Sequence, residues 1–493
     1  MLSQHFPILL VVVPLIASPV IVMARSGFLG WVASLAASAA AFAMSVALLV
    51  ATTESGAISY AIGSWPPPWG IEYRVDAANA LVALLVSAIA LVVLPYARRS
   101  VSAEIGQERL YLFYALLMLC LAGLLGIAVT GDAFNLFVFL EISSLATYVL
   151  IALGRNRRAL TAAYQYLILG TIGATLYVTG VGLLYLATGT LNLADMAARL
   201  ADVPDKRPLV AGLAFITAGV GLKLALFPLH AWLPNAYAYA PSAVSAFLAA
   251  TATKVAVYVL MRVYFSVYGV DAVFRDMPLG PVLAVLSVAA LFIASAAAIV
   301  QKDLKRLLAY SSVAQIGYIT LGISLGSAPG LTAAVAHLVN HGITKGALFL
   351  LAGAIALRAG GTGFDRVAGL GRTMPLTAFA FVLGGLSLIG VPGTAGFASK
   401  WALVAAAIGA GHWWIAAAVL LSSLLAVAYV WKFVECAYFR GPPGDAPDPG
   451  EAPADMTIPA FALTAAVIAA GLFAWPVLEA SARAAEALMG APR

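Results

Sequence analysis

The chain has 493 residues, of which 63% are hydrophobic and only 10% are charged. A soluble domain is excluded, because so few polar side chains could not cover a surface that faces water. The formal net charge of +6 comes mainly from short loops, and no basic run is suited to nucleic acid. We therefore expect a lipid bilayer around the chain and no nucleic-acid partner.

Apolar segments of about 20 residues, each long enough to cross a bilayer as a helix, recur along the whole chain. The first begins MLSQHFPILLVVV, lacks a basic start and is interpreted as a span, not as a cleaved signal peptide. No segment shows the alternating pattern of strands. We predict an all-α integral membrane protein with about fourteen transmembrane helices, near residues 5–24, 27–50, 77–97, 110–130, 133–153, 160–187, 208–228, 241–266, 279–300, 307–326, 330–357, 375–408, 412–437 and 457–480.

Two of these segments, the seventh at 208–228 and the twelfth at 375–408, are interrupted. Proline removes a backbone donor and clashes with the preceding turn, so a helix should break there. Broken helices persist at bilayer depth only where protein or a water-filled cavity satisfies the freed backbone groups. The residues expected at the breaks are Pro228, Pro234, Gly390 and Pro392.

The interrupted segments are five spans apart, which suggests two repeats. An odd number of helices in each repeat would make the repeats inverted, as in many secondary transporters. We therefore divide the single membrane domain 1–493 into N-terminal helices 1–3 (1–107), a first five-helix repeat of helices 4–8 (108–266), a second of helices 9–13 (279–438), and helix 14 (457–480).

Loop charge orients the bundle. Loops after even-numbered spans hold few basic residues, and acidic residues dilute them. Loops after odd-numbered spans hold Arg25, Arg98, Arg99, Arg155, Arg157, Arg158, Lys302, Lys305, Arg306, Arg358, Arg366 and Arg372. The positive-inside rule then places both termini outside. We expect the chain in the inner (plasma) membrane of a prokaryote. The Pro/Gly-rich acidic segment 441–455 is interpreted as a flexible linker on the inner side.

Four ionisable residues lie well inside apolar segments: Glu141, Lys223, Lys254 and Lys400. A lysine at mid-bilayer depth costs at least about 2.5–3.5 kcal/mol on insertion scales, so it usually has a partner, a water-filled cavity and a function. Lys223 precedes Pro228 by five residues, and Lys400 lies eight residues after the second break. Both lysines are therefore expected close to unwound backbone, where water can enter.

Glu141 is the acidic residue placed to pair with Lys223. Desolvation lowers the pKa of a lysine and a nearby carboxylate raises it. A lysine that alternates between paired and unpaired states could therefore bind and release a proton near neutral pH. The alternative is a static ion pair that fixes helix packing. The further buried lysines and histidines favour transport.

The segment AHLVNHGITKGALF contains His337, His341 and Lys345 at a spacing of i, i+4 and i+8. That spacing places the three residues on one face of a helix. Histidine titrates near neutral pH and can pass a proton through its two ring nitrogens. A lone buried histidine is more often structural, but three ionisable residues on one stripe favour proton transfer.

Weaker candidates lie near helix ends. His230, at the first break, is either a relay or a loop anchor, and His412 and Lys432 are candidate exit-side groups. The charged run QKDLKR at 301–306 is interpreted as an inner loop and helix start with a structural role.

Motifs that bind nucleotides, flavins or clusters are absent: the chain has no GxxxxGK[ST] loop, no GxGxxG after a strand and no CxxC set. We therefore expect no cofactor and no metal site. Cys120 and Cys436 are interpreted as packing residues. The energy must come from an ion gradient or from a neighbouring subunit.

Several strings resemble the antiporter-like subunits shared by respiratory complex I and Mrp-type cation/proton antiporters: FLEISSLATYVL, GLKLALFPLHAWLPNAYAYAPSAVSAFL, KRLLAYSSVAQIGY, HLVNHGITKGALFLLAG and GVPGTAGFASKW. The likeness covers nearly the whole chain, and LFPLHAWLPNAYAYAPS is highly specific to that superfamily. The resemblance implies a bundle of about fourteen helices with inverted five-helix repeats. It also implies a central hydrophilic axis along which protons move as ion pairs form and separate.

By motif, Glu141 resembles the glutamate of span five and Lys223 the central lysine of broken span seven. Lys254 resembles the bridging group of span eight, and Lys400 resembles the terminal residue of broken span twelve. His337, His341 and Lys345 resemble the polar stripe of span eleven.

Within the superfamily, the lysine at position 400 and the string GDAFNLFVFLEISSLATYVLIALG are most similar to the Mrp D subunit. The resemblance implies a proton-translocating, non-enzymatic subunit of a multisubunit Na⁺(K⁺)/H⁺ antiporter, with other membrane subunits as partners. One alternative is an antiporter-like subunit of a redox-driven complex, either complex I NADH:quinone oxidoreductase or an energy-converting hydrogenase. Another is a scaffold whose buried charges only hold partners together.

Overall fold

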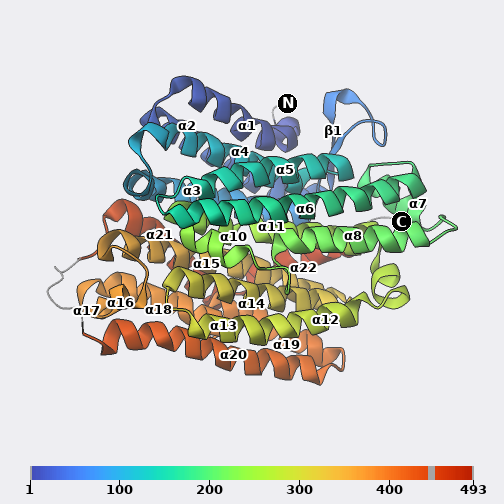
Figure 1. Cartoon of the computed structure of the whole chain (residues 1–493). Helices are drawn as coiled ribbons and strands as arrows, with labels where there is room; N and C mark the ends of the chain where they lie inside the picture. The colour runs from blue at the N-terminus through green and yellow to red at the C-terminus, as the bar shows by residue number, and fades with distance from the viewer. Residues whose placement is uncertain (1–2, 442–449, 491–493) are drawn as a thin grey trace.

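The computed structural model describes residues 3–441 and 450–490. Long helices run side by side between the two ends of an elongated bundle (Figure 1). We call the end that carries α16 (Phe364–Val367) and α17 (Leu370–Thr373) the basic face. The opposite end carries strand β1 (Ile58–Ala61) and helix α7 (Leu193–Leu200), and we call it the hairpin face.

The elements fall into four stretches along the chain. The N-terminal stretch comprises η1 (Ser3–His5), α1 (Phe6–Ala24), α2 (Gly27–Ser55), β1, η2 (Ile62–Ser64), β2 (Glu72–Val75) and α3 (Ala77–Glu104). The second comprises η3 (Gln107–Arg109), α4 (Leu110–Val129), α5 (Ala133–Ala152), α6 (Arg157–Thr188), α7, α8 (Arg207–Leu224), α9 (Leu233–Tyr239), α10 (Ser242–Ala250), α11 (Ala252–Met261) and η4 (Arg262–Val267).

The third stretch comprises η5 (Asp271–Asp276), α12 (Leu279–Ala289), η6 (Ala290–Ala294), α13 (Ser295–Val300), α14 (Leu304–Ser324), α15 (Ala328–Ala359), α16, α17, α18 (Pro375–Ile389), α19 (Ala395–Gly409), α20 (Trp413–Val434) and η7 (Glu435–Phe439). The last comprises α21 (Ala454–Leu472) and α22 (Trp475–Met489). Most of the predicted linker at 441–455 lies outside the described residues.

Thirteen helices in the described part of the chain are long and apolar enough to cross a membrane. The two shorter apolar helices α18 and α19 together make one more, interrupted, span. The predicted class, an all-α membrane protein with about fourteen spans, is therefore confirmed. Exposed aliphatic and aromatic side chains cover the outside of the bundle, as lipid contact requires.

Several helices begin where a polar side chain precedes an apolar run. Asp132 caps α5 by accepting a hydrogen bond from the backbone N–H of Asn135, and Asp303 caps α14 in the same way. Asp76 forms a capping box with Asn79 at the start of α3. Such caps satisfy backbone donors that the first helical turn leaves unpaired, and they fix where each span begins.

The two predicted breaks are present. Helix α8 ends at Leu224, and Ala225 adopts a left-handed conformation with φ 60° before the chain turns toward α9. Helix α18 ends at Ile389, and Gly390 adopts a left-handed conformation with φ 91° before α19 begins at Ala395. A left-handed residue closes a helix by redirecting its backbone, and glycine adopts it without the steric cost that Ala225 bears.

Three features differ from the sequence-based expectation. Span eight is also interrupted, because Thr251, between α10 and α11, has φ −125° and ψ −59°. The helix predicted at 457–480 is divided: α21 ends at Leu472, and α22 begins with a proline at its first turn, where a missing N–H costs nothing. Strands β1 and β2 pair antiparallel. They were not predicted, because a four-residue strand outside the membrane is too short to show an alternating pattern.

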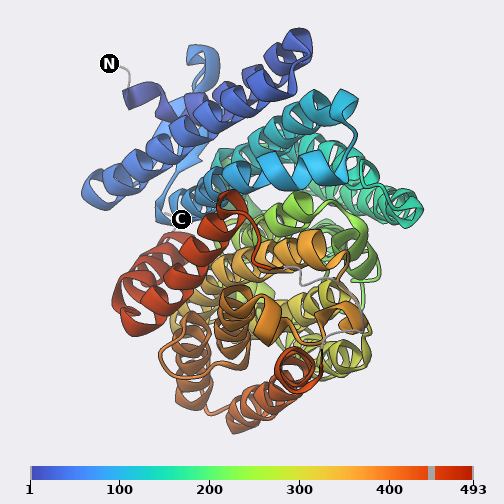
Figure 2. The ribbon, with the colours of Figure 1, turned by 90° about the vertical axis from the view of Figure 1, so that its left-hand side faces the viewer.

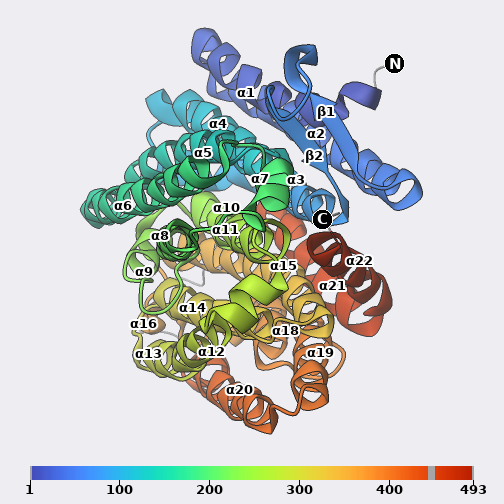
Figure 3. The same ribbon diagram turned by 90° about the vertical axis from the view of Figure 1, so that its right-hand side faces the viewer.

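Helix α15 lies at the centre of the bundle. It packs against α3, α10, α14, α18, α19, α21 and α22, and it lies between the blue-to-green first half and the yellow-to-orange second half (Figure 3). Figure 2, the view toward the basic face, shows α1 and α2 on the outside of the first half. The ends of the described chain both lie toward the hairpin face: His5 Nδ1 is 3.0 Å from the hydroxyl of Tyr60, and Ser266 donates to the carbonyl of Leu488.

Candidate functional site

The first buried charge pair joins α5 to the end of α8. Nζ of Lys223 lies 3.7 Å from Oε1 of Glu141. The lysine also donates to Oγ of Ser144 at 2.7 Å, and the hydroxyl of Tyr148 lies 3.5 Å away. The Lys223 side chain is 5% exposed and that of Glu141 is 25% exposed. The ammonium group thus has both a charged and a neutral acceptor within reach.

Aromatic rings hold this pair against the break. The rings of Tyr148 and Tyr166 meet edge to face, and Tyr166 stacks on Trp232 with centroids 3.8 Å apart. The indole N–H of Trp232 donates to the carbonyl oxygen of Leu222 at 2.8 Å. A carbonyl near the end of α8 is therefore satisfied by the segment that follows the break, as buried backbone requires.

A small cavity separates Lys223 from α11. It has a volume of about 20 Å³ and is lined by Ser144, Tyr166 and Lys223 on one side and by Ala252 and Ala256 on the other. This volume is enough for one water molecule. Water could therefore bridge the first ion pair to the helix that carries the next lysine.

Lys254 lies just beyond the interruption of span eight. Its Nζ donates to the carbonyl oxygen of Ala249 at 2.5 Å and approaches Oγ1 of Thr253 at 3.4 Å. The side chain is 1% exposed. The twist at Thr251 turns the carbonyl groups of α10 away from regular helical bonding, which leaves an acceptor for the lysine.

The predicted stripe of α15 faces the core, but its two histidines have different surroundings. His337 is bonded at both ring nitrogens: Nδ1 lies 2.9 Å from Oγ of Ser399, and Nε2 lies 2.9 Å from Oε1 of Gln315. His341 stacks on His337 with centroids 6.1 Å apart. Neither ring nitrogen of His341 has a hydrogen-bond partner in the described chain. An unpartnered buried ring is costly unless water reaches it.

Lys345, one turn further along α15, is fully buried. Its Nζ donates to the carbonyl oxygen of Leu308 at 2.8 Å and to Oγ of Ser311 at 2.5 Å, both on α14. The stripe therefore connects α14 to the centre of the bundle through neutral acceptors.

Lys400 reaches back across the second break. Its Nζ donates to the carbonyl oxygens of Leu388 and Ile389 at 2.9 and 3.1 Å, and to Oγ of Ser423 at 3.1 Å. The ammonium group also lies 4.2 Å from the centre of the Tyr318 ring. The carbonyl end of a helix attracts a positive charge, and an aromatic face does the same.

Among the buried lysines Lys223, Lys254, Lys345 and Lys400, only Lys223 has an ion-pair contact with a carboxylate in the described chain. The other three have carbonyl or hydroxyl acceptors. An ammonium ion in such a place is expensive unless its proton can leave. The row therefore has the chemistry of groups that can exchange protons.

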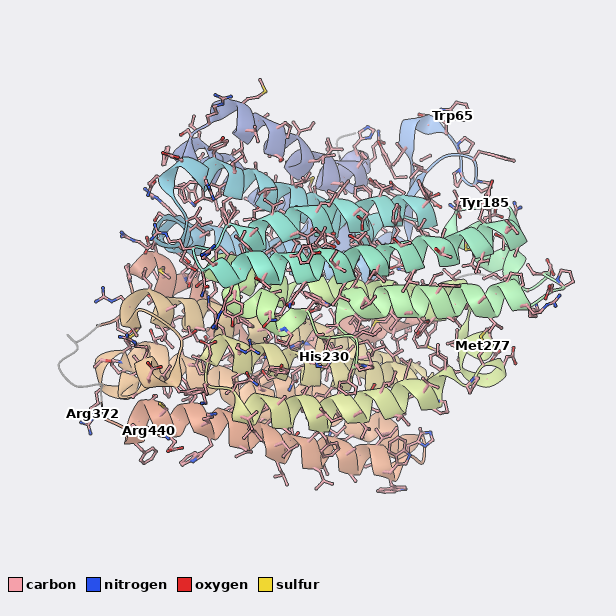
Figure 4. The ribbon with its side chains drawn as sticks, viewed as in Figure 1. Trp65, Tyr185, His230, Met277, Arg372 and Arg440 are labelled. Atoms are coloured by element: carbon pink, nitrogen blue, oxygen red, sulfur yellow. The ribbon has the colours of Figure 1, made fainter. Side chains whose placement is uncertain are left out.

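His230 lies about midway between the two faces (Figure 4). Its ring stacks on Phe227 with centroids 5.2 Å apart and meets Tyr310 edge to face. Its Nδ1 is buried without a partner in the described residues. Pro228 and Pro234 flank it, in the turn that follows α8 and in the first turn of α9.

The remaining two candidates do not join the buried row. Lys432 donates to the carbonyl oxygens of Ile299 and Gln301, at 2.7 and 2.6 Å, where α13 ends. These bonds tie α20 to a loop of the basic face. His412 is exposed in the turn between α19 and α20. Their predicted exit-side function rests on sequence alone.

Sequence reasoning missed two sets of buried charges. Lys305, interpreted as part of an inner loop and helix start, is 5% exposed and donates to Oγ of Ser242 at 2.9 Å. The backbone N–H of Ser242 in turn donates to Glu104. Arg262 and Asp76 form an ion pair at the hairpin face. Both sets lie at predicted span ends, where a charge looks like a headgroup anchor. The signal available was the i, i+4, i+8 spacing that links Lys254 to Arg262.

Residues 130–426 match the family described as NADH:quinone oxidoreductase/Mrp antiporter, TM. The chain belongs to this family. It is 42% identical over 487 residues to the N subunit of the NADH-quinone oxidoreductase of Desulforudis audaxviator, and the match covers 96% of each chain. It is 31% identical over 446 residues to the D subunit of the Na⁺/H⁺ antiporter of Alkalihalophilus pseudofirmus, with 90% of this chain and 89% of that one covered. The predicted resemblance to this superfamily is confirmed.

Solved structures give the same result. A chain of the Mrp complex from Dietzia sp. superposes with a TM-score of 0.90 at 28% identity, covering 99% of this chain and 98% of that one. A chain of the archaeal membrane-bound sulfane sulfur reductase gives 0.89 at 29% identity, with 98% and 97% covered. A chain of respiratory complex I from Thermus thermophilus gives 0.76 at 26% identity, with 96% and 98% covered. All three are chains of multisubunit membrane complexes, and this multi-pass membrane protein shares their fold.

Proposed function

We propose that this protein is the proton-translocating subunit of a multisubunit Na⁺(K⁺)/H⁺ antiporter of the Mrp type. Protons move along a row formed by Glu141, Lys223, Lys254, the α15 stripe and Lys400. The similarity to the D subunit of a Na⁺/H⁺ antiporter and to a chain of the Mrp complex supports this assignment.

The single observation that carries the proposal is the Glu141–Lys223 contact beside the break of span seven. The ammonium group has a second acceptor, Ser144, at 2.7 Å. When Glu141 pairs with the lysine, the proton stays on Nζ, because the carboxylate stabilises the charged form. When the pair opens, desolvation favours the neutral amine and the proton is released.

The proton released from one lysine brings positive charge close to the next ionised group, and the repulsion between them drives the next step. A proton that leaves Lys223 can cross the small cavity beside α11 toward Lys254, and then pass to the stripe that includes His341. The unpartnered nitrogens of His341 suit a group that accepts a proton on one side and releases it on the other. Lys400 takes the last position of the row.

In this proposal the basic face is cytoplasmic and the hairpin face is external, so both termini lie outside the plasma membrane of a prokaryotic cell. The loops of the basic face hold most of the arginines, which is the distribution that the positive-inside rule predicts. The partners are other membrane subunits, the transported ions are H⁺ with Na⁺ or K⁺, and lipid surrounds the bundle.

We further propose that spans four to eight (108–266) and nine to thirteen (279–438) are inverted repeats within one membrane domain, with helices 1–3 (1–107) and helix 14 added to them. The support is the matched position of the two breaks, each with a buried lysine within about two turns. Inverted repeats of this kind place ion sites at their interface.

The second candidate is an antiporter-like subunit of a redox-driven complex. It is favoured by the 42% identity to an N subunit of NADH-quinone oxidoreductase. The proton row would work in the same way, but electron transfer in a neighbouring subunit would drive it. The two candidate functions differ in what drives the protons, and they share the same row of residues.

The test is cation-driven proton movement in vesicles that carry the whole complex. We expect a Na⁺ or K⁺ gradient to produce a ΔpH with the wild type, and Glu141→Ala or Lys223→Ala to abolish it. Lys302→Ala is the matched control, because Lys302 is an exposed lysine of the basic face and its removal should leave the ΔpH unchanged.

Three outcomes separate the alternatives. No cation-driven ΔpH in the intact wild-type complex overturns the antiporter proposal. Proton movement that follows electron donors and not cation gradients supports the redox-driven complex. A complex that assembles with Lys223→Ala and still moves protons at the wild-type rate indicates a scaffold.

A further inference from the structure

A second line of polar groups leaves the proton row toward the hairpin face. Lys254, Tyr258 and Arg262 follow one another at i, i+4 and i+8 in span eight, so they share one face of the helix. All three are largely buried. Span eight packs against α3, α4, α8 and α15, which places this face inside the bundle and away from lipid.

An ion pair closes the outer end of this line. The guanidinium of Arg262 donates from Nη2 to Oδ1 of Asp76 at 2.9 Å, and its Nη1 lies 2.8 Å from Oδ2. Nε of Arg262 donates to the hydroxyl of Tyr258 at 3.1 Å. Burial would raise the pKa of Asp76, but Arg262 and two backbone N–H donors outweigh it and hold that pKa below its usual range.

Beyond the ion pair lies a cavity of about 50 Å³ with several polar side chains in its lining. It is bounded by Tyr258, Arg262 and Asp76, by Glu72 and Arg74 of the hairpin, and by Ala194 of α7, which is exposed. The volume is enough for at least one water molecule, and the lining offers it several polar partners. Water at the hairpin face can therefore approach the carboxylate of Asp76.

Lys254 can turn between two directions. Its Nζ now donates to Ala249, which lies toward the basic face, whereas Tyr258 lies one turn toward the hairpin face. Residues four apart on a helix have Cβ atoms about 5–6 Å apart. A lysine side chain is comparable in length to that spacing, so a rotation about its own bonds would turn Nζ from Ala249 toward Tyr258.

We infer that Lys254, Tyr258, Arg262 and Asp76 form a gated outlet through which protons pass between the centre of the first half and the hairpin face. The inference rests on the proposed proton transport. An N–H bond of the Lys254 ammonium breaks, and the Tyr258 oxygen accepts that proton and gives up its own. The carboxylate of Asp76 gains the O–H bond and releases the proton to cavity water. Arg262 keeps its charge and holds Asp76 ionised between transfers.

The test uses a variant that removes one hydroxyl group and keeps the ring. Tyr258→Phe in the whole complex should slow proton movement by about tenfold or more, since one positioned proton carrier is lost. Tyr264→Phe is the matched control: Tyr264 is equally buried, and its hydroxyl contacts Thr217, outside the outlet. Asp76→Asn should slow proton movement like Tyr258→Phe, and Asp76→Glu should restore most of the rate.

Water access is measured separately from transport. Ser266 lines the cavity, so Ser266→Cys should react with a membrane-impermeant thiol reagent added outside intact cells. Ser45→Cys, which is fully buried, should not react. An unreactive Ser266→Cys, or equal rates for Tyr258→Phe and Tyr264→Phe, overturns the outlet. Failure of the proposed function would instead appear as a wild-type complex that moves no protons, while the labelling result still decides whether the cavity is open to the outside.

Discussion

The two broken spans hold their lysines in different ways. At the first break, Lys223 contacts the carboxylate of Glu141 and the hydroxyl of Ser144. At the second, Lys400 binds two carbonyl oxygens that the end of α18 leaves free, together with Ser423. The first lysine is therefore bonded to a hydroxyl group with a carboxylate beside it, and the second is held by fixed backbone dipoles.

This difference suggests a division of labour. A carboxylate can move away or gain a proton, so the Glu141–Lys223 pair can change the charge state of its lysine. Backbone carbonyls keep their partial charge at any pH, so they offer Lys400 a constant environment. We expect the first break to control proton uptake and the second to provide a stable end to the row.

The largest effect is expected from Glu141→Gln, which keeps the size of the side chain and removes its charge. Proton movement should fall by about a hundredfold or more, because in the proposed function the Glu141 carboxylate is the group that switches Lys223. Cation-driven ΔpH in vesicles measures this rate. Glu451→Gln is a suitable control, since Glu451 binds the start of α18 at the basic face. A comparable loss of proton movement in both variants would show that the first break has no special role in transport.

The next effect concerns the stability of the second break. Lys400→Met should destabilise the protein by about 2 kcal/mol, because the carbonyls of Leu388 and Ile389 lose a donor that bonds both. Thermal unfolding in detergent measures the change. Lys254→Met is the comparison, since Lys254 bonds a single carbonyl and should cost less. A Lys400→Met protein as stable as the wild type would show that the break needs no lysine.

Packing at the breaks should differ as well. A Cβ atom at Gly396 would overlap the carbonyl of Ser387, whereas at Gly221 the nearest atom would be 3.3 Å away, on the flexible side chain of Leu229. Gly396→Ala should therefore destabilise the protein by about 1–3 kcal/mol, and Gly221→Ala should have little effect. Thermal unfolding of the two variants decides this, and equal losses would mean that the breaks are packed alike.

The main elements could be predicted from sequence because their causes are local. Spans follow from the length of apolar runs, and the breaks at Pro228 and Gly390 follow from the chemistry of those two residue types. The interruption at Thr251 could not be predicted, because threonine has neither the rigid ring of proline nor the conformational freedom of glycine. There the tertiary surroundings, and not the residue type, determine the backbone.

The candidate site was predictable only in part for a similar reason. A charge in the middle of an apolar run stands out, so Glu141 and Lys223 could be found from sequence. Asp76 and Arg262 are 186 positions apart and lie at span ends, where charges are common. Only the packing of α3 against span eight reveals that they meet. The sequence likewise does not reveal that the ring nitrogens of His341 have no hydrogen-bond partner in the described chain.

The smallest effects should come from the serines that assist each lysine. Ser144→Ala and Ser423→Ala each remove one hydroxyl acceptor, and each should cost about 1 kcal/mol of stability.

Their effects on transport should nevertheless differ. Ser144 accepts the hydrogen bond that Lys223 keeps when Glu141 moves away, so its loss should slow proton movement several-fold. Ser423 is a third acceptor for Lys400 beside two backbone carbonyls, so its loss should leave the rate unchanged. Measuring unfolding and vesicle ΔpH on the same two preparations separates these effects: equal stability losses with unequal rates support a switch at the first break, whereas equal rates would mean that both serines serve only to hold a lysine in place.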